Sequence, residues 1–193
     1  MSSLAQRLEL LEEDLKADPP RISAYHDLPF AIFRYDPAEE WTLRREARLM
    51  ATRLEQSGKR VAIIPMSSFL WKAIEESEGI DPVVDLEKER GFVAAQEQVT
   101  TYLSDRDWCP LARLVADRLE QLSRNADIAF LTRAGAMAPG IYHMSKLLDE
   151  MKGKTRLTMI LFYPGSIEGT TGLRFMAIKD RDALGNYRVK IYG

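Results

Sequence analysis

The sequence predicts an α/β protein with three layers, in which helices cover both faces of a mostly parallel central sheet. Apolar segments of strand length alternate with amphipathic helical segments, which is typical of parallel sheets. Residues 66–123 contain helical patterns alone and predict a helical insertion. Two closely spaced strand patterns near the C-terminus predict an antiparallel pair. A chain of 193 residues suits one domain, so we expect residues 1–193 to form a single α/β domain.

The first predicted element is an acidic amphipathic helix over residues 3–17, which ends before two prolines. Leucines at helical spacing form its apolar stripe: Leu4, Leu8, Leu11 and Leu15. This stripe packs either on the body of the protein itself or on a partner. Residues 1–20 are therefore also a candidate docking element.

A strand, a helix and a second strand follow. Residues 30–35 predict the first strand, and Asp36 and Pro37 predict a helix start, as cap and first helical residue. Gly58 ends this helix, and residues 61–64 predict the second strand. We expect the two strands to be parallel, because a helix connects them.

The alternation of strands and helices resumes after the insertion. Residues 127–131 predict a strand, residues 139–151 a helix, and residues 157–163 a strand that we expect to end at Pro164 and Gly165. A glycine-rich loop then leads to a strand at residues 173–176. The last predicted strand is half-buried, because Tyr187, Val189 and Ile191 alternate with Arg188, Lys190 and Tyr192.

Composition excludes several classes of protein. A net charge of -2 and a pI near 5.8 give no general attraction to nucleic acid. No apolar run approaches the ~20 residues of a membrane span, and the N-terminus lacks the features of a signal peptide, so we expect a cytoplasmic protein without membrane contact. One cysteine and two histidines are too few for a convincing zinc site, so we expect no metal and no cofactor.

Known catalytic motifs are not matched. Residues 153–155, Gly-Lys-Thr, resemble the end of a phosphate-binding loop, but Leu148 stands where that motif requires glycine. Residues 165–169, Gly-Ser-Ile-Glu-Gly, precede a strand, whereas the serine of a hydrolase elbow precedes a helix. We therefore predict no catalytic residue.

The carboxyl ends of the predicted parallel strands meet at one edge of the sheet, where α/β proteins bind ligands. The candidate ligand- or partner-binding residues at this edge are Arg34, Asp36, Arg133, Gly135, Tyr163, Gly165, Glu168, Thr170, Thr171 and Arg174. Arginines, hydroxyls and glycine amides in this combination suit a phosphate or carboxylate.

Structural roles remain open for several of these residues. Asp36 is also explained as a helix cap, and Gly135 as a turn residue. Ser67 or Ser68 is similarly explained as the cap of the next helix. Each arginine at a strand end either pairs with an acid such as Glu168 or contacts a ligand.

Five segments of the chain resemble the BrxB family of bacteriophage-exclusion (BREX) defence systems. They are FAIFRYDPAEEW (30–41), GFVAAQEQV (91–99), FLTRAGAMAP (130–139), FYPGSIEGTTGLRFM (162–176) and RDALGNYRVKIYG (181–193). The resemblance implies a role beside other BREX proteins, which methylate host DNA and block phage DNA replication. It implies PglZ, a protein resembling alkaline phosphatases, as the first partner to test, and it brings no catalytic motif.

Three functions therefore remain in view. The first is a non-catalytic, protein-binding BREX component, with PglZ as partner. The second is a sensor or enzyme that binds a phosphate or nucleotide at the strand edge. The third is a nucleic-acid-binding factor that uses basic helix surfaces, Arg44, Arg45 and Arg48 or Lys146, Lys152 and Lys154, although such spacing is also that of an ordinary solvated face. A homodimer is compatible with each.

Overall fold

The computed structural model describes residues 3–22, 29–123, 125–168, 172–178 and 189–193. Its α-helices are α1 (Leu4–Lys16), α2 (Glu40–Gln56), α3 (Met66–Ser77), α4 (Ile80–Arg90), α5 (Phe92–Ser104), α6 (Leu111–Leu122) and α7 (Met144–Glu150). Its 3-10 helices are η1 (Pro37–Glu39) and η2 (Ala134–Met137). Its strands are β1 (Phe30–Tyr35), β2 (Val61–Pro65), β3 (Ile128–Thr132), β4 (Thr158–Glu168), β5 (Gly172–Phe175) and β6 (Lys190–Tyr192).

The central sheet has the strand order β2-β3-β4-β1-β6, and every neighbouring pair in it is parallel. The additional strand β5 pairs antiparallel with β4. The predicted α/β fold, with a mostly parallel sheet and a C-terminal antiparallel pair, is therefore confirmed. The strands β1 and β2 are parallel as expected, but β4 and β3 lie between them.

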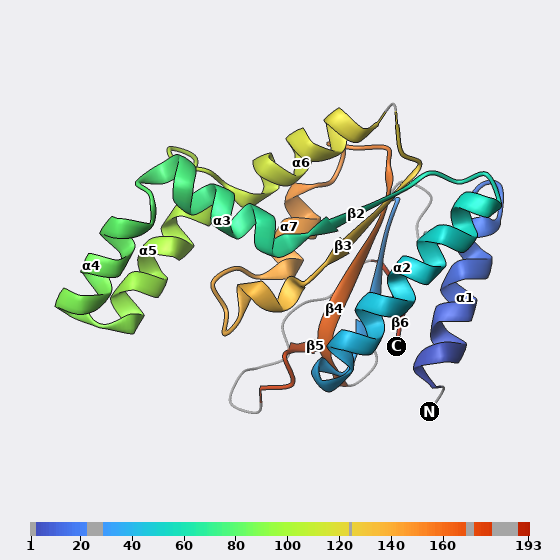
Figure 1. Cartoon of the computed structure of the whole chain (residues 1–193), viewed down its shortest axis with the longest axis horizontal. Helices are drawn as coiled ribbons and strands as arrows, with labels where there is room; N and C mark the ends of the chain where they lie inside the picture. The colour runs from blue at the N-terminus through green and yellow to red at the C-terminus, as the bar shows by residue number, and fades with distance from the viewer. Residues whose placement is uncertain (1–2, 23–28, 124, 169–171, 179–188) are drawn as a thin grey trace.

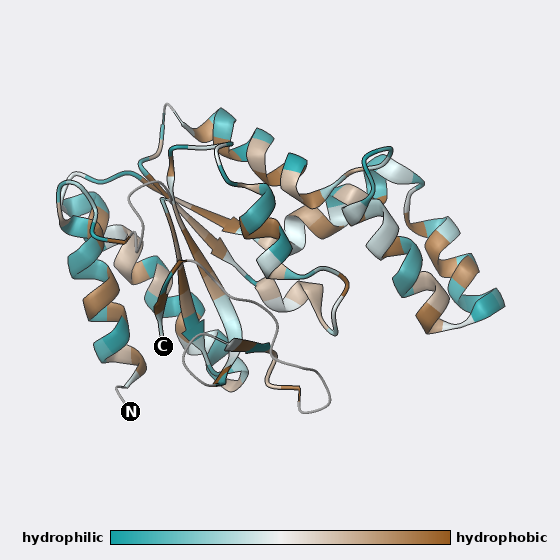
Figure 2. Ribbon diagram, turned by 180° about the vertical axis from the view of Figure 1, so that it is seen from behind, coloured by the Kyte–Doolittle hydropathy of each residue, from teal (hydrophilic) through white to brown (hydrophobic). Residues whose placement is uncertain are grey.

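Two hydrophobic cores lie on opposite faces of the sheet and create the three layers (Figure 1). Alternate residues of β1 enter different cores: Ile32 packs on the side of α3, α6 and α7, whereas Phe33 packs on the side of α1 and α2. The strands are accordingly hydrophobic along most of their length (Figure 2). Every residue of β3 is buried for the same reason.

The N-terminal helix α1 belongs to the body of the protein. Ser3 begins it with a capping box, in which its hydroxyl accepts from the backbone N–H of Gln6. Leu8, Leu11 and Leu15 are buried in the core beneath α2, and Leu4 packs against the same core. The leucine stripe thus contacts the protein itself, the first of the two alternatives for this helix.

Strand β4 is longer than the sequence predicts, because it continues through Pro164 and Gly165 instead of ending there. Its first part pairs with β1 and β3, and from Gly165 onward it pairs with β5. A Cβ atom at Gly165 would overlap the carbonyl oxygen of Arg174 and lie 2.9 Å from Cε1 of Tyr163. Glycine is therefore required where β5 closely approaches β4, and the predicted break was wrong.

Two further predictions differ from the structure. Helix α7 begins at Met144 instead of Pro139, because the residues that follow Pro139 form a turn in which Gly140 has a positive φ of 158°. In the last strand, Tyr192 is the buried residue, since it packs on the core beneath α1 and α2. Ile191 packs on the core at the opposite face of the sheet. The alternation of side chains along this strand therefore does not distinguish a buried face from a solvent-exposed one. Tyr187 and Arg188 lie outside the described residues.

The predicted helical insertion is confirmed as α3, α4, α5 and α6. Helices α4 and α5 pack on each other and project from the body, whereas α6 returns to the sheet (Figure 1). We call α4 and α5 together the arm. Within the described part of the chain, no helix is long and apolar enough to cross a membrane.

Candidate functional site

The carboxyl ends of four strands lie at the same edge of the sheet. Tyr35, at the end of β1, is level with Pro164 in β4, and Pro65, at the end of β2, is level with Thr132 in β3. Segments that are distant in the sequence therefore meet here, as the parallel arrangement requires.

A pocket of about 340 Å³ opens at this edge, and we call it the edge pocket. Its charged and hydroxyl-bearing residues are Glu40, Arg44, Ser67 and Arg133. Its other lining residues are Pro37, Gly135, Ala136, Pro164 and Met176. Of the ten edge residues predicted from sequence, Arg133 and Gly135 line this pocket.

Arg133 directly follows β3 and has an exposed side chain. Its backbone is left-handed, with φ 57° and ψ 36°, a conformation that is rare for residues other than glycine and that is concentrated at functional sites. Within the described residues its guanidinium forms neither a hydrogen bond nor an ion pair. Arg133 thus brings an uncompensated positive charge to the pocket.

Another part of the pocket lining contains a hydrogen-bond network around Glu40. The Nε of Arg44 donates to Oε1 of Glu40 at 2.6 Å, and the hydroxyl of Tyr35 donates to Oε2. Burial, together with the Glu40 carboxylate, raises the pKa of Tyr35 well above its ordinary value. The guanidinium of Arg44 also lies 4.7 Å from the ring centre of exposed Trp41. Glu40 is therefore already neutralised within the protein.

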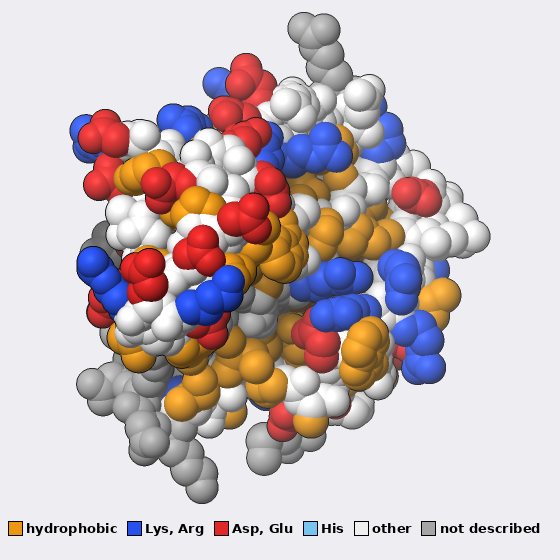
Figure 3. Space-filling model, turned by 60° about the vertical axis from the view of Figure 1, so that its left-hand side comes forward, with side chains coloured by type: hydrophobic (Ala, Val, Ile, Leu, Met, Phe, Trp, Pro, Cys, Tyr) orange, Lys and Arg blue, Asp and Glu red, His pale blue; other side chains and the backbone are white. Residues whose placement is uncertain are grey.

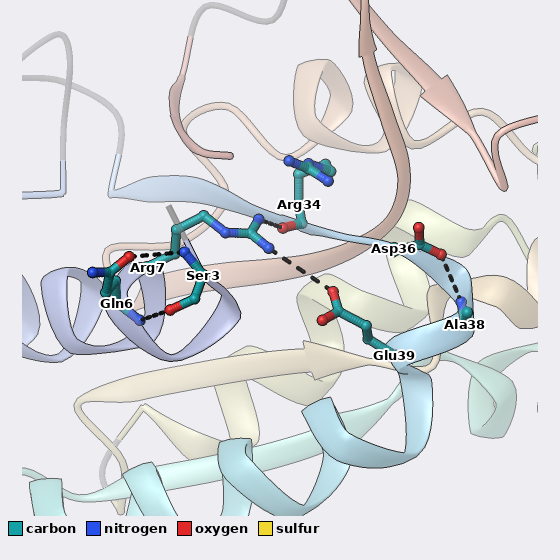
Figure 4. Close-up of polar contacts among 7 residues, drawn as sticks. All are labelled: Ser3, Gln6, Arg7, Arg34, Asp36, Ala38 and Glu39. Atoms are coloured by element: carbon teal, nitrogen blue, oxygen red, sulfur yellow. Dashed lines mark hydrogen bonds and ion pairs between the residues drawn. The ribbon is translucent and has the colours of Figure 1, made fainter. Parts of the chain in front are cut away.

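Most other predicted edge residues have structural contacts. Asp36 accepts from the backbone N–H of Ala38 at 2.9 Å, and thus caps η1 (Figure 4). Glu168 forms an ion pair with Arg174 across the β4–β5 pair, so its observed partner is neither Arg34 nor Arg133. Tyr163 is buried, with its ring edge against Phe175. Thr170 and Thr171 lie outside the described residues.

The backbone of Arg34 forms a hydrogen bond with a side chain of α1. Its carbonyl oxygen accepts from Nη1 of Arg7 at 2.5 Å, while its own side chain points away from Arg7 (Figure 4). Burial and the nearby charge of Arg34 lower the pKa of Arg7. The Nε of Arg34 is buried and has no hydrogen-bond partner among the residues that the structure describes. Arg34 does not line the edge pocket.

Ser67 and Ser68 lie in the first turn of α3 and do not cap that helix as the sequence suggests. The cap position is Pro65, and the Oγ of Ser68 donates back to the carbonyl oxygen of Pro65 at 2.6 Å. Ser67 instead lines the edge pocket, in the first turn of α3. Within the described part of the chain, no group of three metal-ligating side chains lies close enough to hold a metal ion.

The candidate nucleic-acid surfaces are largely neutralised by neighbouring acids. Arg44 pairs with Glu40, and Arg45 with Glu46. On α7 and the turn after it, Lys146 pairs with Glu150, and Lys152 with Asp149. Ion pairs of this kind are usual on solvated helix faces.

The arm exposes apolar side chains on both of its helices. Phe92 is 59% exposed and Val93 is 66% exposed, at the start of α5. Ile80 and Val84 are exposed along α4. Adjacent residues on a helix do not share a face, so the consecutive pair Phe92-Val93 was the signal that both could not pack inward.

The charged residues of the arm are mainly acidic. Its exposed acids are Asp81, Asp85, Glu87, Glu89 and Glu97, against the basic residues Lys88 and Arg90. Figure 3 shows acidic and hydrophobic side chains interspersed on the face of the molecule where the arm comes forward. The arm is thus an acidic projection with apolar residues on its surface.

Two comparisons with known proteins match the chain to the same family. The model of the family described as BREX protein BrxB matches residues 62–191. A protein of Bacillus cereus (strain H3081.97), named BREX protein BrxB, is 25% identical over 159 residues, which are 80% of this chain and 80% of the relative. No solved structure matches the chain. Because the family model covers β2 to β6, and thus most of the sheet, the insertion and the arm, the chain belongs to the BrxB family.

Proposed function

We propose that this protein is a non-catalytic, protein-binding component of a BREX phage-defence complex, acting in the cytoplasm with PglZ as its direct partner. Family membership supports the BREX assignment. The observation that carries the protein-binding role is the arm, which presents Phe92 and Val93 to solvent at the start of α5.

Exposure of these side chains is unfavourable in the isolated protein. Burial of an apolar side chain of this size contributes ~1.5–3 kcal/mol, so a partner that covers both residues gains substantial binding free energy. Aromatic residues are also enriched among the side chains that dominate protein interfaces. The arm projects from the body, and a partner therefore reaches these residues without disturbing the sheet (Figure 1).

The charge of the arm specifies the chemistry of the partner surface. The acids of α4 and α5 surround the apolar residues and favour a surface on which an apolar patch is flanked by lysine or arginine. Such charges accelerate association and select the partner, whereas the apolar residues supply the affinity. The contact on PglZ is accordingly an apolar patch with a basic rim.

The test is co-purification of PglZ with the tagged protein, from cells that carry the complete BREX island. The double variant Phe92→Ser with Val93→Ser is expected to lose PglZ. Its stability remains that of the wild type, because both side chains are exposed and serine is tolerated in the first turn of a helix. Leu10→Ser is the matched control, since Leu10 is an exposed leucine on α1, and it is expected to retain PglZ.

Two results contradict the proposal. Recovery of the wild-type protein without PglZ in low salt contradicts the partnership. Loss of PglZ in the Leu10→Ser variant, with retention in the double variant, moves the contact from the arm to α1. A third possibility is that the arm binds a second copy of this chain. Gel filtration of the purified protein tests it, since the wild type would then be a homodimer and the double variant a monomer.

A further inference from the structure

We infer that the edge pocket binds a small ligand that carries a phosphate group, a binding activity separate from the proposed contact of the arm. The arrangement that carries this inference is a pocket at the carboxyl edge of the sheet, lined by the first turn of α3 and by Arg133, which has no acidic partner among the described residues. The family comparisons assign no ligand to these residues.

Charge is the first reason. Arg44 and Glu40 neutralise each other at 2.6 Å, so Arg133 leaves the lining with a net positive charge. The Glu40 carboxylate also accepts a hydrogen bond from the Tyr35 hydroxyl. Because both of its oxygens are occupied within the protein, Glu40 does not compete with a phosphate group for Arg133. An arginine guanidinium has several donors in one plane and therefore matches the oxygens of a phosphate group.

The position of the donors is the second reason. Ser67 lies in the first turn of α3, where backbone N–H groups without helical partners carry partial positive charge. Its hydroxyl is free of the backbone contact that occupies Ser68. Gly135 lines the same pocket without a side chain, so a ligand can approach the backbone after Arg133 closely. These donors come from two different strand ends, β2 and β3, and converge on one volume.

Size and polarity limit the ligand. A volume of about 340 Å³ lies at the lower end of the range for small-molecule pockets, which excludes a long polymer from the interior. Pro37, Ala136, Pro164 and Met176 form apolar walls, which suit the uncharged portion of a phosphorylated metabolite. The pocket therefore fits a phosphate monoester with a compact organic group.

The test is calorimetric titration of the purified full-length protein with inorganic phosphate, AMP and adenosine. We expect AMP to bind, phosphate to compete with it, and adenosine to bind at least tenfold more weakly, because the phosphate group provides the main contact. The variant Arg133→Gln is expected to weaken AMP binding tenfold or more, which is the usual effect of losing a hydrogen bond to a charged group. Arg106→Gln is the control, because Arg106 is also exposed and does not line the pocket, and AMP affinity is expected to stay unchanged.

Each remaining outcome overturns the inference. Equal affinity for AMP and adenosine would show that the phosphate group is not recognised. Equal AMP affinity in Arg133→Gln and the wild type would remove the arginine from the site. Absence of binding for both AMP and phosphate at millimolar concentration ends the proposal. Binding of a 5′-phosphorylated oligonucleotide in preference to AMP would identify a nucleic-acid contact instead. Thermal unfolding of both variants without ligand verifies that they are folded.

Discussion

The hydroxyl of Tyr192, on β6, donates a hydrogen bond to the Asp14 carboxylate, on α1, at 2.7 Å. The same carboxylate accepts from Nζ of Lys190 at 2.5 Å and lies 3.3 Å from Nε of Arg21. Only 8% of the Asp14 side chain is exposed. The first helix and the last strand are thus joined by a nearly buried carboxylate, and α1 is a fixed part of the domain.

Removal of this carboxylate is expected to destabilise the protein strongly. Asp14→Ala leaves the Tyr192 hydroxyl without its acceptor and the Lys190 ammonium with the backbone carbonyl of Arg21, and it lowers the free energy of unfolding by about 3 kcal/mol. Tyr192→Phe removes one hydrogen bond and lowers it by about 1 kcal/mol. Glu13→Ala, at an exposed neighbour, changes it by less than about 0.5 kcal/mol. Urea unfolding at pH 7 measures all three, and equal values for Asp14→Ala and Glu13→Ala would show that the junction does not stabilise the fold.

The ion pair between Arg60 and Asp127 predicts a dependence of stability on acid. Hydrogen bonds from the side chain and backbone of Arg60 lower the pKa of Asp127 to about 2, below the ~3.9 of an unfolded chain. The stabilisation of the fold by the ionised Asp127 is complete at a pH above the pKa of this residue in the unfolded chain. It is lost as the pH falls through the pKa of about 2 in the folded protein. The difference in urea midpoint between wild type and Asp127→Asn is therefore expected to shrink between pH 6 and pH 3, and a constant difference would contradict the assignment.

Asp14 is expected to contribute in the same direction. Burial alone would raise its pKa, but the hydrogen bonds from Lys190 and Tyr192 and the charge of Lys190 lower it overall. A lowered pKa in the folded state means that stabilisation is present at neutral pH and decreases in acid. The double variant Asp14→Asn with Asp127→Asn should consequently show a weaker loss of stability in acid than either single variant.

The two glycines Gly165 and Gly135 are expected to respond differently to alanine. At Gly165 the new methyl group would overlap the backbone of Arg174, so Gly165→Ala separates β5 from β4 and costs about 2–3 kcal/mol. At Gly135 the nearest atom to the new methyl group is Sδ of Met176 at 3.6 Å, an ordinary contact, and stability should change by less than about 1 kcal/mol. Thermal unfolding of both variants tests this, and similar melting temperatures would contradict the close approach of the strands.

The left-handed backbone of Arg133 predicts an unusual order of stability. Arg133→Gly should be more stable than Arg133→Ala by about 1 kcal/mol, because alanine has a Cβ atom that disfavours positive φ. At Arg106, where φ is not positive, the order should reverse, with alanine favoured over glycine. Denaturant unfolding of the four variants measures both differences. The same order at the two positions would show that Arg133 is not held in this conformation in solution.

Local patterns in the sequence determined most of the secondary structure. The spacing of Leu8, Leu11 and Leu15 defined α1, and the pair Asp36 and Pro37 marked the start of a helical segment, because caps and periodicity depend on residues a few positions apart. The helical insertion and the parallel strands were determined in the same way. The predicted edge could also be located, since connection by helices makes strands parallel and brings their carboxyl ends together.

Only the tertiary structure decided which residues at that edge share a pocket and which residues remain exposed. Arg133 and Ser67 converge because β2 pairs with β3, a long-range contact that no local pattern encodes. Glu168 pairs with Arg174 because β4 continues past Pro164 and meets β5. Phe92 is exposed because the arm leaves the body, although its sequence has the apolar character of a packed helix. Burial depends on what lies opposite a side chain, and the fold supplies that neighbour from a distant part of the chain.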